Sequence, residues 1–149
     1  TTQRPLNEEG RKLATEIGQS IRKAKIPITE IHASPLCRVR DTVAAAFPGR
    51  APTIDDKLMY VANFTDEQKQ PIIRNTRRLL SQPVANGSNR LIVAHAPNLM
   101  ELLGYFPKEG TLVIFLPQGD DRFEYVASVS PSAWPALIRG QKATATPAR

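Results

Sequence analysis

The sequences EIHASPLCR at residues 30–38 and LIVAHAPN at residues 91–98 each run from apolar, strand-like residues into the start of a helix. In both, a proline stands near the junction, where the first turn of a helix tolerates its missing N–H. Such junctions are typical of a parallel α/β sheet, in which ligands bind at the carboxyl ends of the strands and helix N-termini favour anions. We therefore expect Arg38 and His95 to form two walls of one anion pocket.

Two helices flank the first of these junctions. Asn7 is expected to cap a helix over residues 8–24, whose apolar residues recur at helical spacing. Ser34 is expected to cap a second helix, which has Pro35 in its first turn and ends near Phe47. The strand between the two helices should therefore end near Ser34.

The middle of the chain predicts a third helix and a buried strand. Thr65 and Gln68 have the spacing of a capping box for a helix that ends near Ser81, and Pro71 predicts that its regular part begins late or bends. The unbroken apolar run at residues 91–94 is typical of a strand covered on both faces.

The C-terminal third predicts a short helix over residues 99–104, followed by a β-hairpin. Apolar runs predict its two strands over residues 111–116 and 123–129, joined by a polar turn. The tail from residue 139 is rich in Ala, Thr and Pro and is expected to fray. Together these patterns predict a single domain over residues 1–149, a three-layer α/β/α sandwich with a mainly parallel central sheet.

Composition disfavours several classes of protein. A length of 149 residues suits one domain with its own core. The 20 Lys and Arg against 14 Asp and Glu give a net charge of +6, which attracts anions of many kinds. Nucleic acid is an unlikely partner, because the arginine-rich stretch at residues 74–78 has no interleaved aromatic residues on which bases could stack.

Cys37 is the only cysteine, so no intramolecular disulfide can form. The two histidines do not make a recognisable set of zinc ligands, and we expect neither a metal nor another cofactor. The sequence has no run of 18 apolar residues, and residues 1–5 do not resemble a signal peptide. We therefore expect a soluble chain without a membrane partner, and the compartment and oligomeric state stay open.

Three segments of the chain resemble the histidine phosphatase superfamily, also called phosphoglycerate mutase-like. They are PLNEEGR at residues 5–11, ASPLCR at residues 33–38 with Thr42 one turn later, and VAHAPNL at residues 93–99. The resemblance covers most of residues 4–130, with the three segments in the family's order. It implies a phosphoglycerate mutase-like fold.

The resemblance also implies hydrolysis of phosphomonoesters through a phosphohistidine. A histidine attacks phosphorus in such enzymes, and water then discharges the phosphohistidine. Arg38 matches the family's second arginine and His95 its second histidine, and both would bind the phosphoryl group. A guanidinium suits this role, because it grips two phosphate oxygens and keeps its charge.

The chain departs from the family at the nucleophile. The family signature opens with a strand that ends in an Arg-His pair, and no Arg-His dipeptide occurs in this sequence. We expect that a segment before residue 1 supplies it, and the alternative is a non-catalytic phospholigand-binding or regulatory module of the same fold. His32 is disfavoured as a replacement nucleophile, because the family has an ordinary strand residue there.

Five further residues are weaker candidates for the site. Ser34 and Asn98 are expected to cap helices more than to bind substrate, and Arg4 is a candidate for the pocket rim. Asp55 and Asp56 are candidate general acids, as the only acidic residues between the second and third predicted helices.

The sequence does not name the substrate. Residues 48–64 and 104–110, the loops expected around the phosphate, carry little pattern. A phosphorylated small molecule and a phosphohistidine protein both fit as partners. The absence of a long insertion favours a small phosphatase over a mutase.

Overall fold

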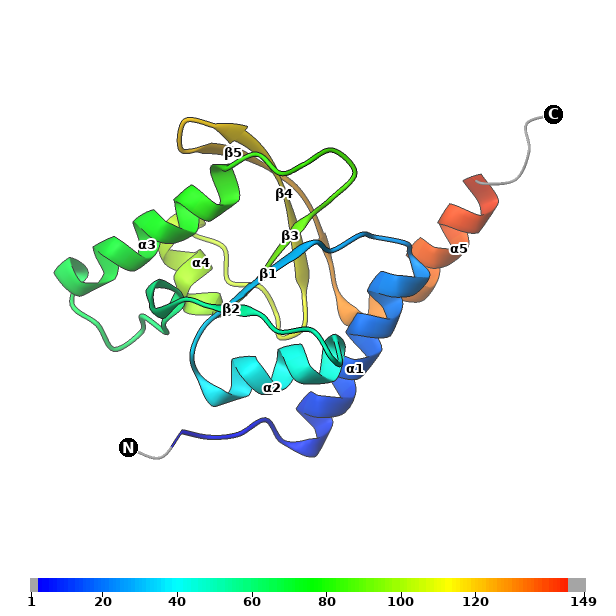
Figure 1. Ribbon diagram of the computed structural model, residues 1–149, viewed down its shortest axis with the longest axis horizontal. Helices are drawn as coiled ribbons and strands as arrows, with labels where there is room; N and C mark the ends of the chain where they lie inside the picture. The colour runs from blue at the N-terminus through cyan, green and yellow to red at the C-terminus, as the bar shows by residue number, and fades with distance from the viewer. Residues whose placement is uncertain (1–2, 145–149) are drawn as a thin grey trace.

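A parallel three-stranded sheet lies at the centre of the fold, with helices on both faces (Figure 1). The computed structural model describes residues 3–144. In chain order the elements are α1 Glu8–Lys23, β1 Glu30–Ala33, α2 Cys37–Ala46, β2 Thr53–Ile54, the 3₁₀ helix η1 Asp56–Leu58, α3 Asp66–Ser81, β3 Arg90–Val93, α4 Ala96–Leu103, β4 Leu112–Gly119, β5 Arg122–Val129, the 3₁₀ helix η2 Pro131–Ala133 and α5 Trp134–Thr144.

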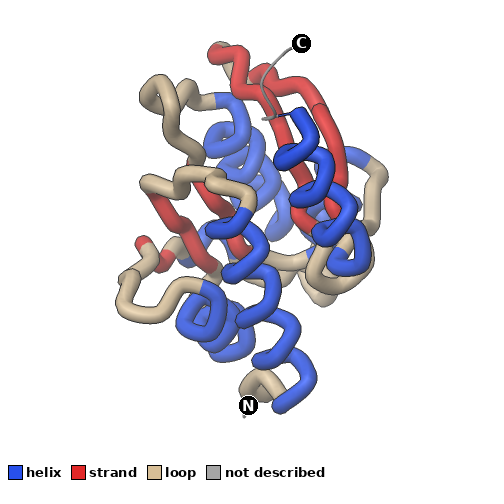
Figure 2. Tube along the Cα trace, turned by 90° about the vertical axis from the view of Figure 1, so that its right-hand side faces the viewer, coloured by secondary structure: helices blue, strands red, loops and turns tan. Residues whose placement is uncertain are grey.

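The strand order in the central sheet is β2-β1-β3, and both pairings are parallel. Ala33 pairs with Val93 on one side and with Ile54 on the other. The carboxyl ends of all three strands therefore meet at one edge. Strands β4 and β5 form an antiparallel hairpin, which Figure 2 shows set apart from the parallel sheet.

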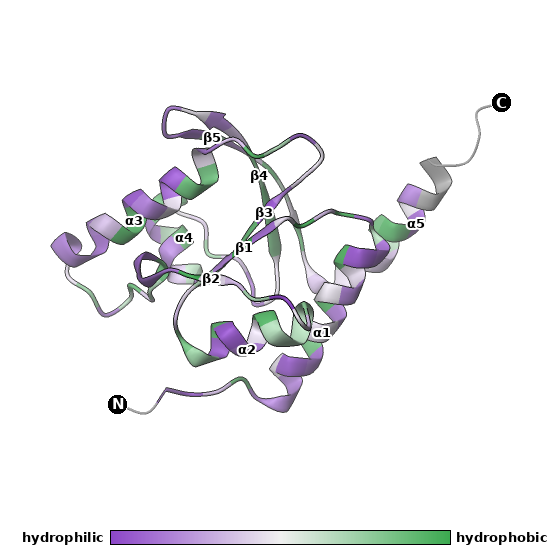
Figure 3. Ribbon diagram, viewed as in Figure 1, coloured by the Kyte–Doolittle hydropathy of each residue, from purple (hydrophilic) through white to green (hydrophobic). Residues whose placement is uncertain are grey.

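Helices α1 and α2 bury their apolar faces against β1. The main core cluster includes Ile21 of α1, Val43 of α2, and Ile31 and Ala33 of β1. Trp134 of α5 is also in this cluster. Helix α3 packs on the other side, where its last turn meets Arg90 of β3. The alternation of purple and green along α3 in Figure 3 reflects this one-sided burial.

The predicted N-terminal caps of α1 and α3 are confirmed. The Asn7 side chain accepts a hydrogen bond from the Gly10 amide (2.8 Å). Both hydrogen bonds of the Thr65–Gln68 capping box are present. The prediction that Pro71 delays α3 is wrong, because this helix is regular from Asp66 and the proline lies inside it.

The predicted start of the second helix is wrong. Helix α2 begins at Cys37 with Leu36 as its N-cap, and Leu36 makes no side-chain capping bond. Ser34 lies earlier, and its side-chain oxygen is 3.4 Å from the Leu36 amide. Ser34 is therefore a turn residue at the end of β1 and not the cap of α2.

The strand predicted at residues 91–94 is present as β3, in a sheet with helices on both faces, but it lies at the edge of that sheet within residues 3–144. Every residue of β3 is only half-buried. Strand β1 pairs with one edge of β3, and no other strand among residues 3–144 pairs with the second edge. Among the same residues, β4 likewise pairs with a strand, β5, along one edge only. Leu91 and Val93 of β3 and Leu112 of β4 all pack against the main core cluster, so both sheets border a shared core.

The C-terminal part differs from expectation in its boundaries. Helix α4 begins at Ala96, earlier than predicted, and ends at Gly104, whose φ of 72° is left-handed. The predicted hairpin is present, and its turn is Asp120-Asp121, with φ values of 53° and 58°. Residues 139–144 continue α5 where fraying was expected, and residues 145–149 lie outside the described part. No helix within residues 3–144 combines the length and apolar character needed to cross a bilayer.

Gly18 allows α1 and α2 to approach closely, and its replacement tests this packing. A Cβ added there would overlap with the carbonyl oxygen of Ala46 in α2. We expect Gly18→Ala to lower the free energy of unfolding by about 2 kcal/mol, because backbone cannot yield as a flexible side chain would. Gly140→Ala is the matched control, since a Cβ in that helix meets no atom within 4 Å. Urea denaturation measures both variants, and equal stabilities would contradict the close approach.

Candidate functional site

Two side chains meet where β1 and β3 end. Because Ala33 pairs with Val93 in parallel, the residues that follow them lie side by side. The Ser34 amide donates to the Val93 carbonyl (3.1 Å), and His95 Nε2 lies 2.8 Å from Ser34 Oγ. Ser34 is fully buried, so this contact fixes the orientation of the imidazole.

The His95 imidazole is neutral at physiological pH. Its pKa is lowered from the usual 6.5 to about 4, mainly by burial and in smaller part by the positive charge of Arg38. The Tyr60 ring stands at right angles to the imidazole, with their centroids 5.4 Å apart. His95 is therefore enclosed by Ser34 and Tyr60, and it lies within the electrostatic reach of Arg38.

Arg38 has its charge free for a ligand. It lies in the first turn of α2 and is exposed. Its guanidinium has no hydrogen-bond or ion-pair partner among residues 3–144, and only its backbone carbonyl accepts a bond, from Thr42. An unpaired cation beside a neutral imidazole and a helix N-terminus creates a local preference for an anion.

The N-terminal segment runs alongside the start of α2. The Gln3 side-chain oxygen accepts a hydrogen bond from the Cys37 amide (2.7 Å), and the Leu6 amide donates to the Asp41 carboxylate (3.0 Å). Arg4 lies between these two anchors and is exposed, so its backbone is near the helix that carries Arg38. Its role at the rim stays a prediction.

Asp55 and Asp56 follow β2, on the same sheet edge as Ser34 and His95 but on the far side of β1. One Asp55 oxygen accepts from the Lys57 amide (2.9 Å), and the other accepts from the Asn75 side chain (2.9 Å). Asp56 is exposed in η1. These contacts fix Asp55 within the loop that follows β2. The assignment of Asp55 or Asp56 as the general acid stays a prediction.

Asn98 is buried and fastens α4 to the loop after η1. Its side chain accepts from the Val61 amide (3.3 Å) and donates to the Met59 carbonyl (2.8 Å). It lies inside α4, whose N-cap is His95, so the expectation that Asn98 caps the helix is wrong. The same loop carries Tyr60, so Asn98 also positions the ring that encloses His95.

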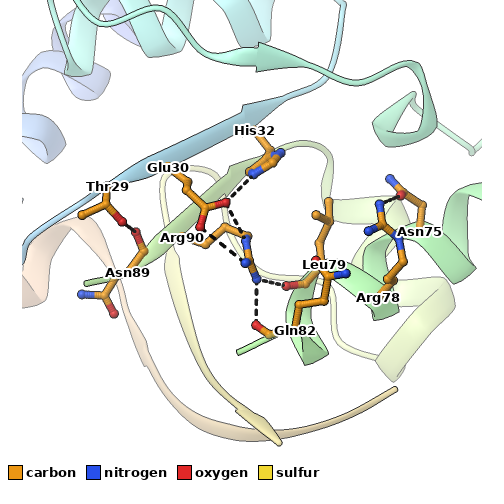
Figure 4. A network of polar contacts seen from close by, with 9 residues as sticks. All are labelled: Thr29, Glu30, His32, Asn75, Arg78, Leu79, Gln82, Asn89 and Arg90. Atoms are coloured by element: carbon orange, nitrogen blue, oxygen red, sulfur yellow. Dashed lines mark hydrogen bonds and ion pairs between the residues drawn. The ribbon is translucent and has the colours of Figure 1, made fainter. Parts of the chain in front are cut away.

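His32 belongs to a separate polar network (Figure 4). Its Nε2 lies 3.0 Å from a Glu30 carboxylate oxygen, which also accepts from Arg90 Nε (3.2 Å). Arg90 donates further to the carbonyls of Leu79 (2.8 Å) and Gln82 (2.9 Å) at the end of α3. The hydrogen bond from His32 and then that from Arg90 lower the pKa of Glu30. His32 is thus engaged on the β1 face opposite Ile31 and Ala33.

Sequence reasoning missed Tyr60 and Gln3. Both contact the site from segments without periodic pattern, and neither residue type signals a role at that position. Among residues 3–144 no group of three or more His, Cys, Asp or Glu side chains is arranged to hold a metal ion.

The lowered pKa of His95 predicts a specific pH dependence of stability. Between pH 6.5 and pH 4 the unfolded chain binds a proton at His95 that the folded chain excludes, so stability falls as the pH falls through this window. Relative to His95→Gln, the wild type should lose about 2 to 3 kcal/mol of unfolding free energy between pH 7 and pH 4. Urea denaturation at a series of pH values measures the difference. Parallel curves for the two proteins would contradict a buried neutral imidazole.

The chain was compared with known families and structures. The model of the histidine phosphatase superfamily (branch 1) matches residues 1–89, a segment that includes Ser34 and Arg38 and ends before His95. No curated protein matches the sequence significantly. Among solved structures, the protein histidine phosphatase SixA, complexed with tungstate, is similar with a TM-score of 0.66 and 16% identity. The alignment covers 89% of this chain and 88% of SixA.

The structural likeness confirms the predicted phosphoglycerate mutase-like α/β fold. The family match spans 89 of 149 residues and contains two of the three segments on which the resemblance was based. The chain belongs to the histidine phosphatase superfamily.

Proposed function

We propose that Arg38 and His95 bind the phosphoryl group of a phosphorylated substrate, and that the protein hydrolyses this group through a phosphohistidine. The observation that carries the proposal is the Arg38 guanidinium, which has no partner among residues 3–144 and whose charge acts on a half-buried, neutral His95. Family membership supports phosphatase-type chemistry. The similar fold of SixA, a protein histidine phosphatase, favours a phosphohistidine protein as substrate.

Each residue has a distinct part in the proposed binding. Arg38 offers parallel N–H donors to two phosphoryl oxygens, where negative charge spreads in the transition state. The anion raises the pKa of His95, so the imidazole gains a proton and donates a charge-assisted hydrogen bond. Ser34 acts as a positioning residue, because its hydroxyl holds the imidazole ring.

We also propose where the nucleophile enters. His32 is paired with Glu30, and His95 serves in binding, so neither histidine is placed to attack. No strand in the described part of the chain pairs with the second edge of β3, and Leu91, Ile92 and Val93 lie only half-buried. A further parallel strand on this edge would bury these residues and bring its own carboxyl end beside His95.

A non-catalytic phospholigand-binding module is the second candidate. The absence of an Arg-His dipeptide from the sequence favours it. Both candidates require the same oxyanion site and differ only in whether a nucleophile reaches it.

Titration with tungstate tests the shared oxyanion site. Because charge-assisted hydrogen bonds contribute about 1.5 to 3 kcal/mol, Arg38→Gln and His95→Gln should each weaken tungstate binding roughly 10- to 100-fold. Arg40→Gln is the matched control, since it removes the same charge from an exposed neighbour on α2. Isothermal titration calorimetry gives the affinities. Equal affinities of Arg38→Gln and the control would remove the assignment of the site.

Hydrolysis distinguishes the two candidates. The 149-residue chain should bind tungstate without hydrolysing p-nitrophenyl phosphate, because neither of its histidines is placed to attack. A protein extended by the natural upstream coding sequence should turn over if that sequence encodes an apolar strand ending in Arg-His. Its phosphohistidine should be trapped on that strand by rapid quench and mass spectrometry. An extended protein that binds tungstate and remains inactive would support the module.

A further inference from the structure

A surface hollow of about 430 Å³ lies at the opposite end of β1 from the Arg38–His95 site. Ile26 and Ile28, which precede β1, line it together with Phe47 and Pro48 at the end of α2. Its remaining lining residues are Arg22 and Arg50. The volume falls in the range of small-molecule sites.

The two arginines are held in place by backbone carbonyls. Arg22 Nη1 donates to the Ala46 carbonyl (2.7 Å), and Arg50 Nη1 donates to the Ile28 carbonyl (2.6 Å). A guanidinium has five N–H donors, so each bond leaves most donors of its arginine unused. Neither arginine has a carboxylate partner among residues 3–144.

The floor of the hollow is apolar. Phe47 belongs to the main core cluster, and Ile26 and Ile28 pack against it while staying half-buried. The hollow thus joins an apolar floor to two fixed positive charges, and no acidic residue lines it.

Capping alone does not account for this arrangement. Arg22 satisfies a carbonyl in the last turn of α2, which is a structural role. The helix dipole also favours a cation there, but Arg50 donates to the carbonyl of Ile28, which lies outside any helix. Both guanidiniums line one hollow that no acidic side chain lines, so an anion bound there would lie in a positive potential.

We propose that this hollow binds a small amphiphilic anion. Its carboxylate or phosphate head lies between Arg22 and Arg50, and its hydrocarbon body covers Ile26, Ile28 and Phe47. The site is independent of the phosphoryl site, because it uses none of the same residues and lies at the amino end of β1.

NMR titration of the 15N-labelled chain tests the site with three probes: octanoate, octan-1-ol and inorganic phosphate. Octanoate should give saturable shifts at the amides of Ile26, Ile28 and Phe47. Octanol lacks the head charge and phosphate lacks the body, so each should bind at least about tenfold more weakly.

Arg50→Gln should weaken octanoate binding roughly tenfold or more, while leaving the capping bond of Arg22 intact. Lys23→Gln is the matched control, because Lys23 is an exposed cation at the end of α1 that does not line the hollow. Urea denaturation verifies that both variants are folded. Equal affinities for octanoate and octanol, equal affinities of the two variants, or shifts confined to residues outside the hollow would each overturn the proposal.

Discussion

The candidate site depends on the register between β1 and β3. The pairing of Ala33 with Val93 places Ser34 next to His95, and a slip of one residue would turn the side chains of one strand to the opposite face. At the other end of the same strand pair, the Glu30 carboxylate accepts from Arg90, which is anchored to the end of α3. This ion pair, in the network of Figure 4, joins the two strands of the site at their other end.

The electrostatics of the candidate site come from one fixed charge, on Arg38, and one titratable group, the imidazole of His95. Arg38 is always charged, whereas burial and Arg38 together keep His95 neutral in the free protein. A second positive charge beside Arg38 would cost free energy without an anion and is favourable with one. Under the proposed function, protonation of His95 is coupled to anion binding, and this coupling depends on the partial burial of the imidazole beside Ser34 and Tyr60.

The features predicted correctly from the sequence are those that depend on residues close together in the chain. Asn7 and the Thr65–Gln68 pair cap helices through bonds within four residues, so their signals survive without tertiary context. Ser34 had the composition of a cap, yet the chain turns once more before α2, and its hydroxyl meets a histidine 61 positions away. Tyr60 contacts His95 from a loop that Asn98 ties to α4. Contacts between residues so far apart in the chain produce no periodic pattern in the sequence.

The two outer edges of the parallel sheet differ in how well they are protected from pairing with a further strand. Strand β2 has two exposed residues and ends in a 3₁₀ helix, as edges protected from further pairing do. Strand β3 instead continues from Arg90 into three apolar residues, and its outer backbone edge pairs with no strand among residues 3–144. An edge of this kind is unfavourable in water and favours a further strand. Ser34, Arg38 and His95 all lie at the ends of elements that are formed without a further strand. The proposed oxyanion binding therefore does not depend on such a strand, whereas the proposed hydrolysis does.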